Sequence, residues 1–233
     1  MILRWSAPGP YVVAFSTRRG GVSEGPYESL NLGRKNGDDP LRVDENRRRL
    51  CEALGADTQR LTLNRQQHSA TVHRAHAGRR GEPGDGLWTD EEGVPMLALG
   101  ADCATIAIAR TDGDRPALAV LHAGWRGLLE GVVASASAAL GGRVAAVVGP
   151  AIGPCCYEVG PEVAEPFAAR FGADVVRGRT LDLWTSAERA LRAAGCPAVD
   201  RIDLCTHCNP DLFFSERRTG RPRGGHGVVG YVA

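Results

Sequence analysis

The sequence predicts a single α+β domain in which mixed β-sheets pack between helices. Short apolar runs rich in β-branched residues occur in clusters between helical segments rather than in strict alternation with them. This order disfavours a doubly wound parallel sheet. No repeat, low-complexity tract or linker divides the 233 residues, and 43 % of them are hydrophobic, which suffices for one substantial core. We therefore expect residues 1–233 to form one domain.

Helical periodicity predicts four helices along the chain. The first is the best defined, because Pro40 stands at its start and Gly55 follows its last apolar residue. Glycines also end two of the others. The predicted helices span residues 41–54, 128–140, 162–171 and 181–194.

Eight β-strands and three unusual loops are predicted between these helices. The strands span residues 11–15, 60–63, 70–74, 96–99, 105–110, 117–121, 144–148 and 199–204. The loops are polar, glycine-rich and interspersed with bulky side chains, and they span residues 16–33, 78–92 and 150–160. Such loops either carry function on a rigid scaffold or form ordinary surface turns.

The charge balance and hydropathy exclude several classes of partner. The chain has 28 basic and 27 acidic residues, so no overall field draws it to nucleic acid or to anionic lipid. No apolar run approaches the roughly 18 to 20 residues that span a membrane, and no signal peptide is recognisable at the N-terminus. We therefore expect a cytoplasmic protein without a nucleic-acid or membrane partner. Lys35 is the only lysine, so we expect arginine to carry any phosphate binding.

Three residues form a candidate metal site. His68 and His122 lie at the ends of predicted strands, and Cys103 lies just before another. One thiolate and two imidazoles suit Zn²⁺ and are acceptable to copper, and three protein ligands leave a fourth position open for catalysis. The irregular spacing is not diagnostic of a metal site, and taken alone it favours a buried cysteine with two structural histidines.

Four other cysteines have no assigned role. Cys205 and Cys208 have the CxxC spacing of zinc ribbons and thiol oxidoreductases, but no second CxxC motif accompanies them. We expect them to be a structural pair in a loop. Cys155 and Cys156 are adjacent, so we expect that they do not bind one metal together, and that one of them packs inward beneath Tyr157.

Six motifs in order resemble the laccase-domain family, the so-called multicopper polyphenol oxidases that are regarded as purine nucleoside phosphorylases. The resemblance runs from about residue 11 to the C-terminus. The motifs are residues 15–33, Gln66-Gln67-His68, Ala101-Asp102-Cys103, His122-Ala123-Gly124-Trp125-Arg126-Gly127, residues 149–159, and Cys205-Thr206 with residues 213–218.

The resemblance implies one zinc ion held by His68, Cys103 and His122. It further implies phosphorolysis of adenosine, inosine and guanosine, with methylthioadenosine as a further substrate and adenosine deamination as a second activity. Two departures from the family pattern concern the pocket. The arginine-rich tail at residues 217–223 is shortened, and Trp88 replaces a small apolar residue.

Candidate substrate contacts follow from what phosphorolysis requires. Arg18, beside the flexible Gly20-Gly21, is the first candidate for a catalytic phosphate contact, alongside Cys103, His122 and His68 in the catalytic set. Guanidinium forks, amides and an aromatic ring could hold phosphate, ribose and the purine. The residues that would supply these groups are Arg18, Arg19, Arg126, Asn31, Gln67 and Tyr157.

Three other functions use the same residues. A soft-ligand site also binds copper, which leaves a copper-dependent polyphenol oxidase as an alternative. Cys103 as a nucleophile with His122 or His68 as its base would make a thiol hydrolase. A purine-binding module without turnover is the third alternative. Whether the chain is a monomer or a homodimer stays open.

Overall fold

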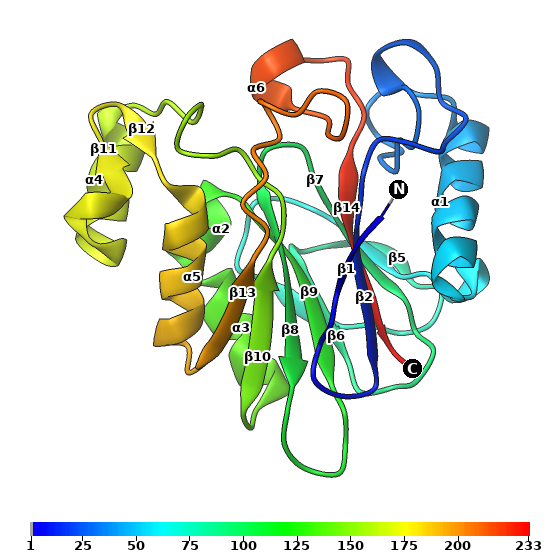
Figure 1. Cartoon of the computed structure of the whole chain (residues 1–233). Helices are drawn as coiled ribbons and strands as arrows, with labels where there is room; N and C mark the ends of the chain where they lie inside the picture. The colour runs from blue at the N-terminus through cyan, green and yellow to red at the C-terminus, as the bar shows by residue number, and fades with distance from the viewer. Residues whose placement is uncertain (1) are drawn as a thin grey trace.

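The structure, a computed structural model, describes residues 2–233 and contains two main β-sheets that pack face to face (Figure 1). The larger sheet has the strand order β13-β10-β8-β9-β6-β4 and includes both parallel and antiparallel neighbours. Its strands are β4 (Val72–Arg74), β6 (Gly86–Thr89), β8 (Ala104–Arg110), β9 (Leu118–Ala123), β10 (Val144–Val148) and β13 (Ala198–Arg201). The smaller sheet has the order β1-β2-β14-β7, with β1 (Ile2–Trp5), β2 (Tyr11–Ser16), β7 (Met96–Gly100) and β14 (His226–Val232).

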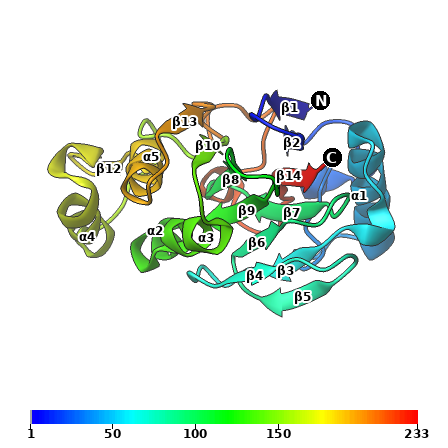
Figure 2. The same cartoon turned by 90° about the horizontal axis from the view of Figure 1, so that it is seen from below.

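Helices cover the outer faces, so the layers run helix, sheet, sheet, helix (Figure 2). The larger sheet is covered by α2 (Trp125–Glu130), α3 (Val132–Leu140) and α5 (Leu183–Ala193), with α4 (Pro161–Phe171) packed beyond them. The smaller sheet is covered by α1 (Pro40–Leu54). This arrangement confirms the predicted α+β class with mixed sheets between helices.

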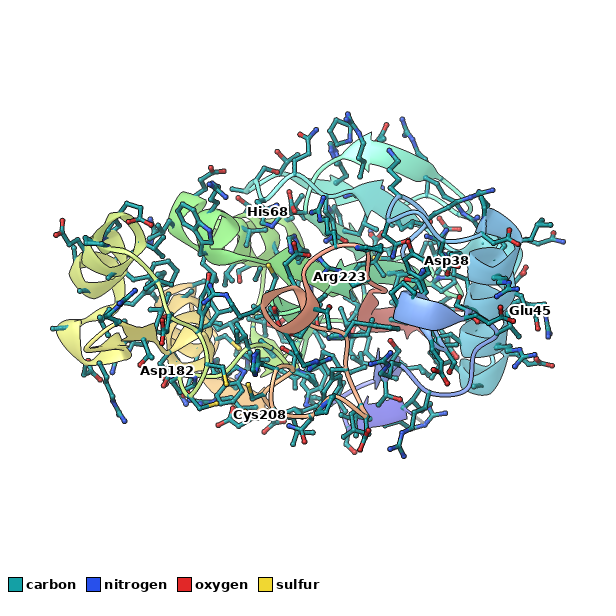
Figure 3. All side chains as sticks on the ribbon, turned by 90° about the horizontal axis from the view of Figure 1, so that it is seen from above. Asp38, Glu45, His68, Asp182, Cys208 and Arg223 are labelled. Atoms are coloured by element: carbon teal, nitrogen blue, oxygen red, sulfur yellow. The ribbon has the colours of Figure 1, made fainter. Side chains whose placement is uncertain are left out.

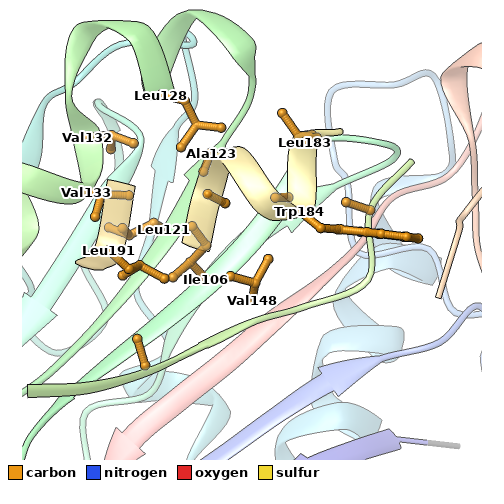
Figure 4. Packing of buried hydrophobic residues seen from close by; sticks show 14 of the residues in the cluster. Ile106, Leu121, Ala123, Leu128, Val132, Val133, Val148, Leu183, Trp184 and Leu191 are labelled. Carbon is orange, nitrogen blue, oxygen red and sulfur yellow. The ribbon is translucent and has the colours of Figure 1, made fainter. Parts of the chain in front are cut away.

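Three apolar cores hold these layers together. The first lies between the larger sheet and its helices, where Ile106, Leu121, Val148 and Trp184 meet (Figure 4). The second fills the space between the two sheets, and the third lies beneath α1. Because β8, β9 and β10 are covered on both faces, they are apolar throughout instead of alternating between apolar and polar residues.

The four predicted helices match the structure with one correction. The side chain of Asp39 accepts a hydrogen bond from the backbone N–H of Leu41, and Gly55 ends α1 in the left-handed conformation. The single helix predicted over residues 128–140 is wrong, because the chain forms two helices there. Gly131 has a φ of 97°, which ends α2 and starts α3.

The strand prediction needs larger corrections. The strand predicted at 60–63 is wrong, since a 3-10 helix (Thr58–Arg60) is followed there by β3 (Leu63–Arg65). The segment predicted as a loop at 78–92 contains β5 (Arg80–Pro83) and β6. Four further strands were not predicted, namely β1, β14 and the two-residue strands β11 (Val176–Arg177) and β12 (Thr180–Leu181).

Strand β14 escaped prediction because glycines interrupt its apolar pattern. A Cβ at Gly227 would lie 2.2 Å from the carbonyl oxygen of Ala98, and one at Gly230 would lie 2.7 Å from Leu118 Cδ2. Close packing of β14 on its neighbours therefore requires glycine at both positions.

The remaining elements are short. They are α6 (Glu216–Thr219), β11 (Val176–Arg177), β12 (Thr180–Leu181), and two 3-10 helices, Gly25–Tyr27 and Ala173–Val175. Across the described residues 2–233, no helix combines the length and the apolar character that crossing a membrane requires.

Candidate metal centre and cavity

His68, Cys103 and His122 meet where the larger sheet ends beneath α2. Cys103 immediately precedes β8 and His122 lies near the end of β9, and these antiparallel strands pair Thr105 with His122. His68 comes from the loop before β4, and its Nε2 lies 3.8 Å from Cys103 Sγ. One ligand atom from each of the three residues falls within 4.8 Å of the others. The structure therefore assembles the predicted group into a set of donors that fits one metal ion.

Asp85 is the buried residue that organises this group. Its Oδ1 accepts a hydrogen bond from His122 Nδ1 at 2.7 Å, which leaves His122 Nε2 available for a metal. The carboxylate also accepts the backbone N–H groups of Gln67, His68 and Ser69. Asp85 is only 1 % exposed. One carboxylate thus fixes both the His68 loop and the His122 ring.

Sequence reasoning missed Asp85 because it lies between Gly84 and Gly86, in a segment predicted to be a loop. Its electrostatics match its role as an acceptor. Burial raises the pKa of Asp85, but hydrogen bonds from His122 and from Ser69 outweigh this and hold that pKa well below its usual range.

Cys103 and His122 polarise each other. Burial raises the pKa of the Cys103 thiol, but the charge and hydrogen bonds of the two histidines lower it to about 6. Burial lowers the pKa of His122, whereas the Cys103 thiolate and Asp85 raise it to about 9. Without a metal, the pair is a thiolate beside an imidazolium at neutral pH. A metal ion that binds here therefore displaces a proton from His122 but none from Cys103.

Two residues at this site have positive φ although they are not glycine. His68 has a φ of 62° and Asp102 has a φ of 94°. Asp102 Oδ1 accepts the hydroxyl of Thr206 at 2.6 Å, and its Oδ2 accepts the backbone N–H of Arg217 at 2.7 Å. These hydrogen bonds thus hold the strained backbone immediately before Cys103.

The first glycine of the His122–Gly127 motif, Gly124, is required by its closeness to the ligands. A Cβ at this position would lie 2.8 Å from His68 Cδ2 and 3.0 Å from Cys103 Sγ. Only glycine lets the start of α2 approach the ligands this closely.

The three ligands line a cavity of about 400 Å³, a size that suits a small organic ligand. Its lining is strongly basic and, among the residues the structure describes, includes no acidic side chain. The basic residues are Arg34, Lys35, Arg47, Arg65, Arg80, Arg221 and Arg223. Figure 3 shows Arg223 and His68 near α6.

Five of these seven basic side chains already have a hydrogen bond or an ion pair within the protein, but two do not. Arg47 donates to the carbonyl oxygen of Leu32, and Arg80 donates to that of Leu61. The side chains of Lys35 and Arg65 have no hydrogen bond or ion pair with any described residue. Their charge is therefore available to an anion that enters the cavity.

The six residues predicted to contact substrate lie outside this cavity lining. They are Arg18, Arg19, Asn31, Gln67, Arg126 and Tyr157.

Their contacts explain this placement for several of them. Arg18 donates to the carbonyl oxygens of Glu28 and Pro210 and packs over the ring of Phe214. Asn31 is fully buried and braces a turn through Gly33 and Gly225.

Arg126 and Tyr157 lie against other side chains. The guanidinium of Arg126 lies 4.0 Å from the centre of the Trp125 ring. The guanidinium of Arg217 lies 5.5 Å from the centre of the Tyr157 ring.

A second group of thiols stands apart from this centre. The expectation that Cys155 and Cys156 cannot face one metal together is wrong, because a tight turn brings both thiols to the same side. Their sulfur atoms and those of Cys205 and Cys208 all lie within 4.8 Å of one another. All seven cysteines are free thiols in the structure.

The fold and the site define a class of protein with two sheets between helices and a two-histidine, one-cysteine metal centre in a basic cavity. The chain belongs to the family described as "Multi-copper polyphenol oxidoreductase laccase", whose family model matches residues 12–231.

Two curated relatives are similar over nearly their whole length. Purine nucleoside phosphorylase PA4543 of Pseudomonas aeruginosa is 38 % identical, and the match covers 93 % of this chain and 92 % of the relative. Purine nucleoside phosphorylase YfiH of Escherichia coli is 34 % identical, with 95 % of each chain covered.

Solved structures show the same fold. The crystal structure of YlmD from Geobacillus stearothermophilus superposes with a TM-score of 0.90 at 32 % identity, covering 100 % of this chain and 96 % of that one. A protein of Neisseria meningitidis, NMB0706, gives a TM-score of 0.89 at 31 % identity, with coverage of 99 % and 98 %.

Proposed function

We propose that this protein is a zinc-dependent purine nucleoside phosphorylase that converts adenosine, inosine or guanosine and phosphate into the free base and ribose 1-phosphate. The observation that carries the proposal is the cavity. It places the ligand group of His68, Cys103 and His122 in the same space as uncompensated positive charge. Phosphorolysis of a neutral nucleoside needs cations that hold the phosphate dianion, and this cavity offers them next to a candidate metal site. The names of the relatives from Pseudomonas aeruginosa and Escherichia coli support it.

Lys35 and Arg65 are the phosphate contacts that the geometry favours. Both line the cavity, and neither side chain has another partner among the described residues. A guanidinium and an ammonium can each donate charge-assisted hydrogen bonds to phosphate oxygens. In contrast, Arg18 already donates to two backbone carbonyl groups.

The donor set of His68, Cys103 and His122 fits zinc, since one thiolate and two imidazoles are ligands that zinc prefers and a fourth position stays open. When bound, zinc supplies a Lewis acid and lowers the pKa of water in its open position. The protein's contribution is orientation. Asp85 holds His122 with the proton on Nδ1 and anchors the backbone of the His68 loop. We place the enzyme in the cytoplasm, as suits seven free thiols.

The direct test is an assay of zinc-loaded protein with inosine and phosphate. We expect hypoxanthine and ribose 1-phosphate to form, with no product when phosphate is omitted. Cleavage that proceeds equally well without phosphate would contradict the proposal, as would the absence of any product.

A pair of variants tests the phosphate contact. Arg65→Ala should raise the KM for phosphate about 10-fold, because a charge-assisted hydrogen bond is worth roughly 1.5–3 kcal/mol. The matched control is Arg143→Ala, an 81 % exposed arginine next to β10 at the opposite end of the strand from the site. An unchanged phosphate KM in Arg65→Ala would remove Arg65 from the phosphate site.

A thiol hydrolase stays a second candidate because of the polarised Cys103–His122 pair. A nucleophilic Cys103 should be alkylated rapidly at neutral pH, and zinc should protect it. Cleavage of the substrate that is fully retained after zinc removal and does not need phosphate would favour the hydrolase. The same samples, given adenosine without phosphate, report deamination by the appearance of inosine.

A further inference from the structure

The four cysteines outside the metal centre come together because two parallel strands end at the same edge of the sheet. Strand β10 leads into the loop that carries Cys155 and Cys156, and its neighbour β13 leads into the loop that carries Cys205 and Cys208. The loops stay paired beyond the strands, where the backbone N–H of Thr206 donates to the carbonyl oxygen of Ala151 at 3.0 Å. Segments about fifty residues apart in sequence are thus fixed side by side by the backbone alone.

The turns inside each loop aim the thiols at one point. The backbone N–H groups of Cys156 and Tyr157 both donate to the carbonyl oxygen of Gly153 at 3.0 Å, so the chain turns tightly at the two adjacent cysteines. In the other loop, Asn209 closes the turn by donating its backbone N–H and its side-chain amide to the carbonyl oxygen of Cys205. Both turns are held without any bond between the sulfur atoms.

The spacing of the sulfur atoms matches a tetrahedral metal site. Four thiolates at roughly 2.3 Å from one zinc ion lie about 3.8 Å from each other. Cys208 Sγ lies 3.6 Å from Cys155 Sγ and 3.3 Å from Cys156 Sγ, and all four sulfur atoms lie within 4.8 Å of one another. Small shifts of the sulfur atoms, outward for the two pairs with Cys208 and inward for any pair near the 4.8 Å limit, would bring every pair to this distance.

The surroundings also orient the sulfur atoms and leave them accessible. Cys205 is buried, and its Sγ accepts the backbone N–H of Gly153 at 3.2 Å, a contact of the kind that orients metal-bound sulfur. The guanidinium of Arg218 donates to the carbonyl oxygens of Thr206 and His207, within the loop between the two ligands. Cys155 and Cys208 are exposed, which gives an ion a path into the group.

We propose that Cys155, Cys156, Cys205 and Cys208 bind a second zinc ion in a closed tetrathiolate site, separate from the centre at His68, Cys103 and His122. Four protein ligands leave no open position, which is typical of a structural zinc site. In Figure 3, Cys208 and His68 lie on either side of α6.

One loop of the proposed site contacts the residue next to Cys103 of the other metal centre. Thr206 lies between two of its ligands, and its hydroxyl holds Asp102, the strained residue next to Cys103. A zinc ion at the four cysteines therefore fixes the loop that supports the backbone of a ligand to the other centre.

Counting metal ions tests the proposal without reference to activity. The full chain is produced with zinc in the medium and purified under reducing conditions without chelators. We expect two zinc ions per chain in the wild type, one in Cys208→Ser, one in Cys103→Ala and none in the double variant. The matched control is Cys196→Ser, a buried cysteine outside both groups, which should keep two.

A cobalt experiment keeps the proposal testable if a serine variant folds poorly. Cys103→Ala protein loaded with Co²⁺ should show the intense sulfur-to-cobalt charge-transfer and visible bands of a tetrathiolate site, and the additional change Cys155→Ser should weaken them. Three results would overturn the proposal. They are a single zinc ion per wild-type chain that Cys208→Ser retains, a disulfide from Cys208 to Cys155 or Cys156 in reduced-and-repurified protein, and a second site that retains copper in place of zinc.

Discussion

The centre at His68, Cys103 and His122 and the group of four cysteines arise in the same way but differ in what surrounds them. Both form where neighbouring strands of the larger sheet end, and both use soft ligands. The first draws its ligands from three segments, lines a cavity and is braced by a buried carboxylate. The second draws four ligands from two loops, and none of them lines that cavity. A neighbouring cavity and a missing fourth ligand, rather than the ligand chemistry, thus separate the site that we propose to be reactive from the site that we propose to be structural.

The largest separation between the two regions should come from Gly124→Ala. The new methyl group would press on both His68 and Cys103, and displacing ligands by about 1 Å costs on the order of 100-fold in rate. We expect the variant to lose one zinc ion and at least about 100-fold of its phosphorolysis rate. The cobalt spectrum of the four-cysteine group should not change.

Gly93→Ala is the control for glycine replacement as such. A Cβ at Gly93 would meet no atom within 4 Å, although its φ of 65° makes the change mildly destabilising. If Gly124→Ala retains both zinc ions and full rate, the steric account of the motif is wrong.

Asp85→Asn should weaken only the first region. An amide cannot accept all the hydrogen bonds that the carboxylate accepts from His122 and the backbone, so the ligands lose their orientation. Loss of such a partner typically costs 10- to 100-fold in metal affinity. Zinc affinity is measured by chelator competition in a Cys208→Ser background, so that only one site reports.

The neighbouring Asp90→Asn serves as the matched control, since Asp90 is partly exposed and pairs with Arg74 away from the metal ligands. Equal zinc affinities for Asp85→Asn and Asp90→Asn would show that Asp85 does not orient the site.

A pH experiment tests whether His226 stays buried and neutral in the folded chain. His226 packs against Phe213 and Phe214, which follow the four-cysteine loop, and neither ring nitrogen has a hydrogen-bond partner among the described residues. Burial lowers the pKa of His226 to about 3, and the charges of Arg223, Arg218 and Arg18 act in the same direction.

The unfolded chain therefore binds a proton at His226 that the folded chain does not bind, at every pH between about 6.5 and 3. Stability falls as the pH is lowered through this window, by about 2 kcal/mol between pH 7.5 and 5. Denaturant unfolding of His226→Phe should lack this loss, whereas the exposed control His76→Gln should keep it. Identical pH slopes in wild type and His226→Phe would contradict the assignment.

The smallest expected effect belongs to Thr206→Val, which tests the link between the two regions. The change removes the hydroxyl that donates to Asp102 and keeps the side-chain shape. We expect a loss of about 1 kcal/mol in the free energy of unfolding and a several-fold weaker first zinc site. Thr219→Val, on exposed α6, is the control, and an equal effect of both changes would mean that the link carries no coupling.

The sequence predicted those features whose signals are local. Helix α1 was predicted almost to the residue because Asp39, Pro40 and Gly55 mark its ends within a few positions. The grouping of His68, Cys103 and His122 was expected from their positions at or next to strand ends together with the resemblance of their motifs to the laccase-domain family.

Features that depend on distant segments could not be predicted in this way. Strands β6 and β14 contain glycines that are required by contacts with other strands, and those contacts are invisible in a local pattern. Arg18 and Asn31 were predicted to contact substrate because of their residue types, whereas their polar groups are used to hold turns. Proximity of Cys155 and Cys208 arises only from the parallel pairing of β10 with β13.

The placement of β14 has a consequence for how the protein is made. Residues 226–232 form an interior strand, with β2 on one side and β7 on the other. During synthesis, β2 and β7 emerge from the ribosome long before the strand that joins them, so their facing edges stay unpaired until residues 226–232 have also emerged. Nascent chains stalled before residue 226 should therefore bind chaperones and resist native folding, even though they already contain every metal ligand.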